Sequence, residues 1–384
     1  MMTRWAILQL TSALVLLGAC TSSLDGAPCP CVPGWCCWED VCRPESECQV
    51  KIAFVPKASD NPVFRVAYAG ANQAANELNS VVGGPRVEMA CVSPPSLDSN
   101  EQRAAVKQAI DSRPSGLIVS CLDPSVITPV IDDAAAMGIP VIPFDSDCPL
   151  ANRMGFYGID NEQSGMKAAD LLVDAMVKTQ GPNQKSVAIL TGGASAVNLK
   201  GRVDGFTARL SNLYRDVQVI TPISSCDETA ERCGQAIEQI IAAHPALDGL
   251  FITGLWGLQA ACSCDQTTGV SCNCSDQLMP NWKAAAKGKL RTVSYDTFPF
   301  ELALMRQNYL SALISQNYRS WGYNAVTLMF QYLTQAKRAK NFVDSEFEIY
   351  TNDGPIPANL EAEALGPELS SVCDSPLNRR SSGP

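Results

Sequence analysis

The chain has 384 residues, of which 46% are hydrophobic and 18% are charged, a composition that excludes a mainly disordered chain. At about 100–200 residues per domain, this length predicts two domains. The 29 basic and 39 acidic residues give a formal net charge of −10, which argues against electrostatic binding of nucleic acid or anionic lipid. The single histidine, His244, argues against histidine-based catalysis and histidine-rich metal sites.

The first twenty residues have the pattern of an export signal. Arg4 precedes an apolar run over residues 5–17. A membrane span needs about 20 residues, so this run is too short for one. The run ends in Leu-Gly-Ala-Cys, which resembles the lipoprotein box of bacterial lipoproteins. This resemblance implies that residues 1–19 are a signal peptide and that Cys20 is the lipidated first mature residue; the alternative is an ordinary signal peptide with a chance cysteine. Thr21 at the next position permits delivery to the outer membrane, by the same resemblance.

The 17 cysteines favour an oxidising compartment, and setting Cys20 aside leaves the even number that complete disulfide pairing needs. Residues 20–49 hold six further cysteines with too little apolar material for a core, so three disulfides are expected to hold this segment together. Cys226 and Cys233 are close enough to pair locally. The Cys-x-Cys…Cys-x-Cys pattern in the insertion 262–280 fits zinc or disulfides, and export favours disulfides. The sequence leaves the pairing of four cysteines open: Cys91, Cys121, Cys148 and Cys373.

Strands and helices are predicted to alternate from residue 51 onwards. Short apolar runs such as 51–56 are typical of buried parallel strands, and Asp98 followed by Glu101 is a helix-start signal. The expected strands are about 51–56, 86–92, 116–121, 140–144, 156–159, 186–191, 217–223, 249–253, 291–295, 311–315 and 347–350. The expected helices are one from residue 62 and others at about 98–111, 126–135, 162–178, 199–213, 228–243, 299–307 and 321–337.

Two runs of alternating units predict an α/β fold with two Rossmann-like lobes, each a parallel sheet covered by helices on both faces, preceded by the small cysteine-rich segment. Ligands of such folds bind beyond the carboxyl ends of the strands. The expected division is lobe 1 at 50–155, completed by about 317–340, and lobe 2 at 156–316, completed by about 341–352, followed by a mobile tail at 366–384.

The loops after these strands carry polar segments in a recognisable order. They are 60–64 (Asp-Asn-Pro-Val-Phe), 143–147 (Pro-Phe-Asp-Ser-Asp), 158–165 (Gly-Ile-Asp-Asn-Glu-Gln-Ser-Gly), 200–206 (Lys-Gly-Arg-Val-Asp-Gly-Phe), 294–296 (Ser-Tyr-Asp) and 316–318 (Gln-Asn-Tyr). Over about residues 50–352 they resemble the type I periplasmic binding proteins, and within them the ribose-type sugar-binding group. The resemblance implies two lobes joined by a hinge that closes over a ligand.

The residue types in these loops suit a sugar, whose hydroxyls both donate and accept and whose ring has an apolar face. Planar polar side chains would bind the hydroxyls and aromatic rings would cover the ring. By resemblance, the ligand-binding residues are Asn61, Phe64 and Asp145 on lobe 1, Arg202 and Asp296 on lobe 2, and Gln316 at the hinge.

Departures from the ribose-type pattern leave the identity of the sugar open. Trp256 stands close to a position where that group has Asn, and it would stack on the ligand or fill space. Ser146 and Asp147 follow Asp145 where the group has Arg, and Lys57 after the first strand would contact ligand or solvent. Of these, Asp147 and Lys57 are candidates for ligand contact, as is Trp256. Asp160 and Asn161 are expected to form a structural turn, Trp321 to pack in a helix and His244 to lie on the surface.

The predicted function is that of a monomeric, lipid-anchored solute-binding protein on the periplasmic or cell-surface side of the membrane. It would capture a sugar or polyol and deliver it to an ABC-type transporter, with no enzymatic reaction, cofactor, metal or nucleic acid. The alternative is a surface lipoprotein of the same fold that senses a ligand through a signalling or surface partner. A sugar-responsive repressor would need a basic helix-turn-helix before residue 50, where the sequence has a signal and cysteines.

Overall fold

The computed structural model describes residues 26–357, except for 29–30, 32–34, 39–40, 45–46, 60, 82, 194, 265–271 and 356. The predicted signal peptide 1–19, the predicted lipidation site Cys20 and the predicted tail 366–384 lie outside the described residues. None of the described helices combines the length and the apolarity that crossing a membrane requires.

The order of elements is the alternation expected from the sequence. The strands are β1 (Trp35–Trp38), β2 (Val41–Pro44), β3 (Gln49–Val55), β4 (Arg86–Cys91), β5 (Gly116–Val119), β6 (Val141–Pro143), β7 (Phe156–Gly158), β8 (Lys185–Thr191), β9 (Val217–Val219), β10 (Ser224–Ser225), β11 (Gly249–Ile252), β12 (Ser263–Cys264), β13 (Cys272–Asn273), β14 (Arg291–Tyr295), β15 (Ala312–Gln316), β16 (Phe342–Asp344) and β17 (Phe347–Thr351). The helices are α1 (Pro62–Asn79), α2 (Ser99–Asp111), α3 (Pro124–Ala136), α4 (Asn161–Gln180), α5 (Val197–Leu213), α6 (Ala230–Ala243), α7 (Trp256–Gln259), α8 (Pro280–Lys287), α9 (Pro299–Arg306) and α10 (Tyr318–Gln335).

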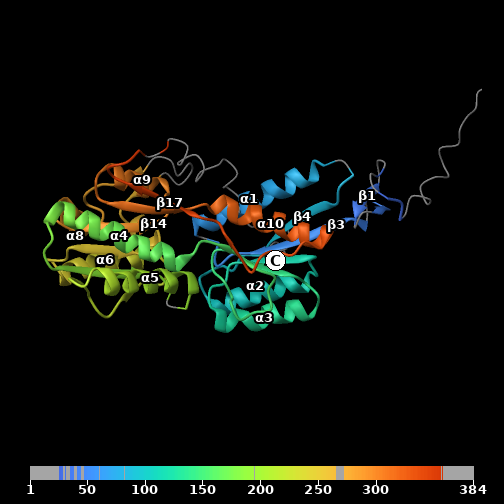
Figure 1. Cartoon of the computed structure of the whole chain (residues 1–384), viewed down its shortest axis with the longest axis horizontal. Helices are drawn as coiled ribbons and strands as arrows, with labels where there is room; N and C mark the ends of the chain where they lie inside the picture. The colour runs from blue at the N-terminus through green and yellow to red at the C-terminus, as the bar shows by residue number, and fades with distance from the viewer. Residues whose placement is uncertain are drawn as a thin grey trace, which may run out of the picture.

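Lobe 1 is built on a parallel sheet with the strand order β4-β3-β5-β6. Helices α1 and α10 lie on one side of β3 and β4, and α2 and α3 lie on the other (Figure 1). Successive residues of a strand face opposite sides of a sheet. Ile52 and Phe54 of β3 therefore pack in the cluster that includes α1 and α10, whereas Ala53 and Val55 pack with α2 and α3. Both faces of the sheet are covered, which explains why its strands are apolar throughout.

Lobe 2 is built on a sheet with the order β10-β8-β11-β14-β15-β17, and β9 also pairs with β8. The edge strand β17 is antiparallel to β15. Val187 and Ile189 of β8 pack on the side of α4 and α5, whereas Ala188 and Leu190 pack on the side of α6 and α9. The strand expected at 217–223 ends at Val219, and β10 follows at Ser224–Ser225, because Pro222 between them has no N–H for a ladder.

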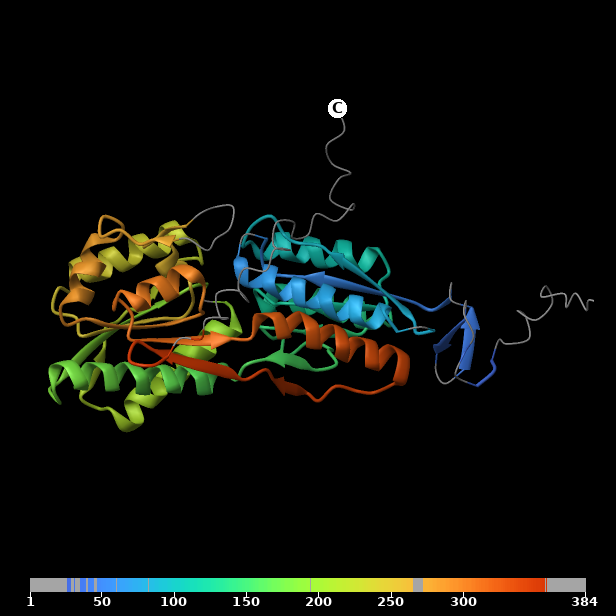
Figure 2. The same ribbon diagram turned by 90° about the horizontal axis from the view of Figure 1, so that it is seen from above.

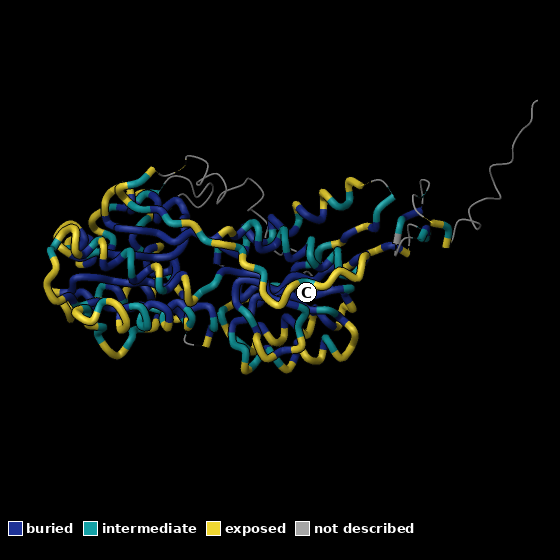
Figure 3. Tube along the Cα trace, in the orientation of Figure 1, coloured by how far each residue is buried: buried dark blue, intermediate teal, exposed yellow. Residues whose placement is uncertain are grey.

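The predicted α/β fold with two Rossmann-like lobes is confirmed, and the buried strands form the centre of each lobe (Figure 3). The chain passes between the lobes at the β7–α4, β15–α10 and β16–β17 connections (Figure 2). β7 pairs with β16 and is joined to the end of lobe 1's sheet by a bridge between Phe144 and Tyr157. The lobe boundary at residues 155 and 156 stays a prediction.

The cysteines of the described residues form disulfides, as the sequence predicts. The local pair Cys226–Cys233 is confirmed, and the insertion holds two disulfides, Cys262–Cys274 and Cys264–Cys272, instead of zinc. Among the described residues, no group of His, Cys, Asp and Glu side chains is arranged to hold a metal ion. Cys121 pairs with Cys148, a pairing that the sequence left open.

The N-terminal cysteine-rich segment contains the antiparallel hairpin of β1 and β2, which lies at the end of lobe 1 remote from lobe 2 (Figure 2). Two disulfides, Cys31–Cys42 and Cys36–Cys48, cross-link it. The hairpin leads almost directly into β3 of lobe 1.

Candidate functional site

A cavity lies where the carboxyl ends of the two sheets face each other. Its free volume is about 20 Å³, which is room for about one water molecule. Eight of the nine predicted ligand residues line it, and only Asp147 does not. The full lining is Lys57, Asn61, Val63, Phe64, Asp145, Asn198, Leu199, Arg202, Glu228, Trp256, Asp296, Gln316 and Trp321.

Asp145, just beyond β6, is the main carboxylate of lobe 1. Its Oδ2 accepts a hydrogen bond of 2.8 Å from Ser120 Oγ and lies 3.3 Å from Lys57 Nζ. Its Oδ1 accepts a bond of 3.1 Å from Nδ2 of Asn198, a residue of α5 in lobe 2. Lys57, only 2% exposed, also donates to Asn198 Oδ1 at 3.1 Å. The two lobes are thus connected across the cavity through one amide side chain.

Arg202 of α5 is the fixed cation of lobe 2. Its Nε donates to Asn161 Oδ1 at 2.9 Å, and its two terminal nitrogens donate to the Thr253 carbonyl at 2.8 Å and to Gln316 Oε1 at 2.7 Å. The guanidinium also lies 4.0 Å from the ring centre of Tyr295, a cation–π contact. These contacts fix the plane of the guanidinium at the cavity wall.

Asp296, just beyond β14, is the main carboxylate of lobe 2. Oδ1 accepts hydrogen bonds from Gln316 Nε2 at 2.8 Å and from the Tyr318 hydroxyl at 2.7 Å, and Oδ2 accepts one from the Leu255 N–H at 3.2 Å. Burial raises the pKa of Asp296 above its usual value, and the charge of Arg202 opposes that rise.

Asp145 and Asp296 occupy corresponding places in the two lobes and share an unusual backbone. Their φ angles are 59° and 80°, the left-handed region that non-glycine residues seldom enter. Such conformations cluster at functional sites, where the surrounding structure enforces them. Both carboxylates line the cavity between the lobes.

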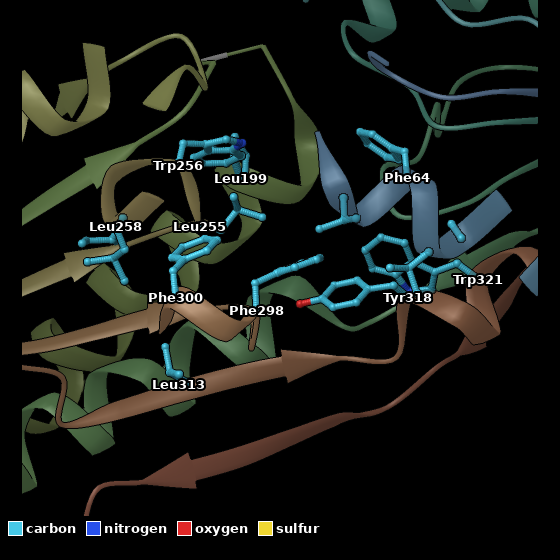
Figure 4. Close-up of a cluster of buried hydrophobic side chains, with 14 of the residues drawn as sticks. Phe64, Leu199, Leu255, Trp256, Leu258, Phe298, Phe300, Leu313, Tyr318 and Trp321 are labelled. Carbon is cyan, nitrogen blue, oxygen red and sulfur yellow. The ribbon is translucent and has the colours of Figure 1, made fainter. Parts of the chain in front are cut away.

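Aromatic side chains form the apolar walls (Figure 4). Phe64 of α1 lies on the lobe 1 side and Trp256 of α7 on the lobe 2 side. A Cβ on Gly254 would lie 2.4 Å from the Trp256 ring, so glycine there makes room for it. Trp321 packs against Phe144, with 6.2 Å between the ring centres, and it also lines the cavity. Within the described chain, the Trp256 and Trp321 indole nitrogens are buried without a hydrogen-bond partner.

Asp147 lies outside this cluster because it is bound elsewhere. Its Oδ2 lies 2.6 Å from Nη2 of Arg153 in an ion pair. Burial raises the pKa of Asp147, against the lowering effect of Arg153. Asn61 is within the cluster but also begins α1, since its Oδ1 accepts from the Val63 N–H at 3.1 Å.

Three polar residues of the site were not predicted as such. Asn161 was expected in a structural turn; Asp160 does cap α4, but Asn161 also holds Arg202. Asn198 precedes the expected helix start and had no sequence signal. Glu228 was expected to begin a helix, but α6 begins two residues later, which leaves Glu228 in the loop after β10. An acidic residue after a strand end is the signal that marked Asp145 and Asp296.

The comparisons with known proteins define the class. A model of the periplasmic binding protein domain matches residues 52–337. The chain therefore belongs to the periplasmic binding protein family, and its fold and resemblances are those of type I members of the ribose-type group.

The individual curated relatives share low sequence identity with this chain. The chain is 27% identical over 157 residues to the ribose import binding protein of Bacillus subtilis, covering 40% of this chain and 48% of that one. It is 23% identical over 199 residues to the D-apiose import binding protein of Actinobacillus succinogenes, covering 52% and 60%. The matches thus span about half to three fifths of these curated relatives.

Solved structures match over more of their length. An ABC transporter solute-binding protein from Burkholderia graminis in complex with D-arabinose matches with a TM-score of 0.67 and 25% identity, covering 79% of this chain and 96% of that one. A carbohydrate transporter solute-binding protein from Agrobacterium radiobacter, also in complex with D-arabinose, matches with a TM-score of 0.71 and 20% identity. The match covers 82% of this chain and 99% of that one, and at this identity it shows a similar fold.

Proposed function

We propose that this protein is an extracytoplasmic solute-binding protein that holds a sugar or polyol reversibly between its lobes and passes it unchanged to an ABC-type transporter. The observation that carries the proposal is the convergence of Asp145, Arg202 and Asp296 from two lobes on one cavity with aromatic walls. The import-binding names of the relatives and the D-arabinose complex of the Burkholderia graminis protein support it.

The polar groups of the cavity would bind the ligand by exchanging partners. In the structure Asp145, Asn198 and Lys57 bond one another, as do Arg202 and Gln316. Ligand hydroxyls, each both donor and acceptor, would replace some of these bonds, because the carboxylates accept and the cations donate. Opening at the hinge would admit the ligand, since a monosaccharide is far larger than the present free volume. Asn61, Phe64 and Trp256 would complete the contacts.

The lipid anchor at Cys20 belongs to the same proposal and rests on the sequence alone. Labelling cells with a radioactive fatty acid should mark the wild-type protein and leave the Cys20→Ser variant unmarked. An unmarked wild-type chain would remove the anchor from the proposal and leave the binding site untouched.

A thermal-shift screen tests the binding function. The panel is D-arabinose, D-ribose, D-apiose, D-fucose, D-glucose and common polyols. A ligand that binds only the folded state raises stability with the logarithm of its concentration above Kd, so at least one sugar should raise the unfolding midpoint in this way. If no member shifts the midpoint at millimolar concentration, the sugar-binding function is wrong. Co-purification of a permease with its ATPase supports transport, whereas a signalling partner supports the sensing alternative.

A further inference from the structure

Glu228 is a buried carboxylate at the cavity that the contacts described so far do not use. It follows β10 and is 7% exposed. It lines the inner cavity together with Asp145 and Asp296, and it also lines a larger cavity of about 470 Å³ between Leu122 of lobe 1 and Ser195 of lobe 2. Glu228 therefore stands at the junction between the inner cavity and this outer one, where the cleft between the lobes widens.

The neighbouring chain is built around the Glu228 side chain. A Cβ on Gly192 would lie 2.4 Å from Glu228 Cγ, so only glycine leaves room for the side chain in this position. The next residue, Gly193, donates its N–H to Glu228 Oε1 at 3.3 Å. The disulfide Cys226–Cys233 ties the start of the loop to α6.

The hydrogen bonding of Glu228 is incomplete compared with the other two carboxylates. Asp145 and Asp296 each have three polar partners at 2.7 to 3.3 Å. The described residues give Glu228 a single hydrogen bond, and that bond is long. An ionised carboxylate can accept about four, and leaving a buried one under-satisfied is costly. Neither oxygen of Glu228 is among the fully buried atoms without a partner, so its free acceptor capacity faces the two cavities, where a ligand hydroxyl would supply a donor.

We propose that Glu228 is a further ligand-binding residue, which accepts a hydrogen bond from the hydroxyl at the end of the sugar that faces the outer cavity. The disulfide Cys226–Cys233 is then a positioning element for that contact. This inference rests on the proposed function, because it assigns a contact at the same site. It makes Glu228 a determinant of specificity: the site selects ligands with a free hydroxyl at this end over analogues in which that oxygen is alkylated.

The test compares two variants that lose the same charge. Glu228→Gln keeps the shape of the side chain and weakens its acceptor, whereas Glu231→Gln changes an exposed residue in the first turn of α6 and serves as the control. Calorimetric titrations use D-arabinose, D-ribose and any other panel sugar that shifts the wild type. We expect Glu228→Gln to weaken binding about tenfold, the difference between a charged and a neutral acceptor, and Glu231→Gln to leave it unchanged.

Stability separates a ligand role from a structural one. Without sugar, Glu228→Gln should unfold at the same temperature as the wild type or higher, because a buried, under-satisfied charge is removed. A sugar that binds the wild type and Glu228→Gln equally overturns the role of Glu228 and leaves the proposed function standing. If no sugar in the panel binds the wild type, both fall.

A double-variant experiment tests the positioning role of the disulfide. The Cys226→Ser, Cys233→Ser chain should bind sugar more weakly than the wild type while its circular dichroism is unchanged. Adding Glu228→Gln to that chain should reduce the affinity for sugar by a smaller factor than it does in the wild type, because the carboxylate is already displaced. Fully additive losses would overturn the positioning role.

Discussion

The two aspartates that end β6 and β14 show how single residues carry this site. Each leaves its strand in a left-handed conformation and is buried, with several donors aimed at its oxygens. Asp tolerates this backbone better than most residues, because its short polar side chain can hydrogen-bond locally. The sequence marked both positions, but it could not show that their backbones direct both side chains into one cavity.

The Asp296→Ala substitution should abolish most of the sugar-induced stabilisation while leaving the fold intact. It removes an acceptor for the ligand, and each lost partner should cost about 1–3 kcal/mol of binding free energy. Thermal shift and calorimetry with the best sugar of the panel measure the effect, and Asp111→Ala, on the exposed end of α2, is the control. An unchanged thermal shift would place the ligand elsewhere.

Glu301 of α9 should make stability depend on pH. Its side chain is 0% exposed, Oε2 accepts from the Phe298 N–H at 2.9 Å, and Oε1 has no partner among the described residues. Burial, and then the charge of Asp296, raise the pKa of Glu301 well above the ordinary 4.5. The folded state therefore keeps the proton to higher pH than the unfolded chain, and the free energy of unfolding should fall as pH rises from about 4.5 towards that raised pKa.

The Glu301→Gln substitution mimics the protonated side chain and should remove that decline. We expect a higher free energy of unfolding at pH 7 than in the wild type and a flatter dependence above pH 4.5. Denaturant titrations between pH 4 and 8 measure it, with Glu231→Gln as an exposed control. Parallel pH curves for the wild type and Glu301→Gln would show that folding does not raise the pKa of Glu301.

At the scale of elements, glycines bring pairs of helices into close contact next to the site. A Cβ on Gly205 of α5 would lie 2.0 Å from the Glu162 carbonyl oxygen of α4. In lobe 1, a Cβ on Gly322 of α10 would lie 1.8 Å from the Ala67 carbonyl oxygen of α1. The first contact fixes the helix that carries Arg202, and the second fixes the helix that carries Trp321.

The Gly205→Ala substitution should therefore affect both folding and binding. The added methyl group must push α5 away from α4, which should cost about 1–3 kcal/mol of stability and displace Arg202, so sugar binding should weaken as well. Gly84→Ala is the matched control, because its Cβ would meet only atoms at 3.4 Å or more. Equal unfolding midpoints for the two variants would show that the helices adjust without strain.

Local patterns predicted most elements, and the misses have local causes. The helix expected from 321 begins at Tyr318, because Asn317 caps it by accepting from the Ser320 N–H at 3.1 Å. α8 was missed because it is short and follows directly on the cysteine insertion. The role of Asn198 could not be predicted: it joins Lys57, 141 residues away, and that contact exists only when the two lobes meet.

For the whole molecule, the narrow cavity and the bonds through Asn198 indicate closed lobes. Asn198→Ala removes both bonds that Asn198 makes to lobe 1, and we expect it to increase the radius of gyration of the sugar-free protein in small-angle X-ray scattering. Saturating sugar should return the radius towards that of this structure, because ligand contacts replace the lost bridge. Identical scattering of wild type and variant, with and without sugar, would argue against a hinge motion.

The cross-linked N-terminal hairpin has a mechanical consequence. Its two cystines keep it from lengthening, and it continues into β3, an interior strand held between β4 and β5. A pulling force applied on the N-terminal side would be transmitted to β3 with little extension of the hairpin. The force would act along β3, so that the hydrogen bonds to both neighbouring parallel strands would bear it at the same time.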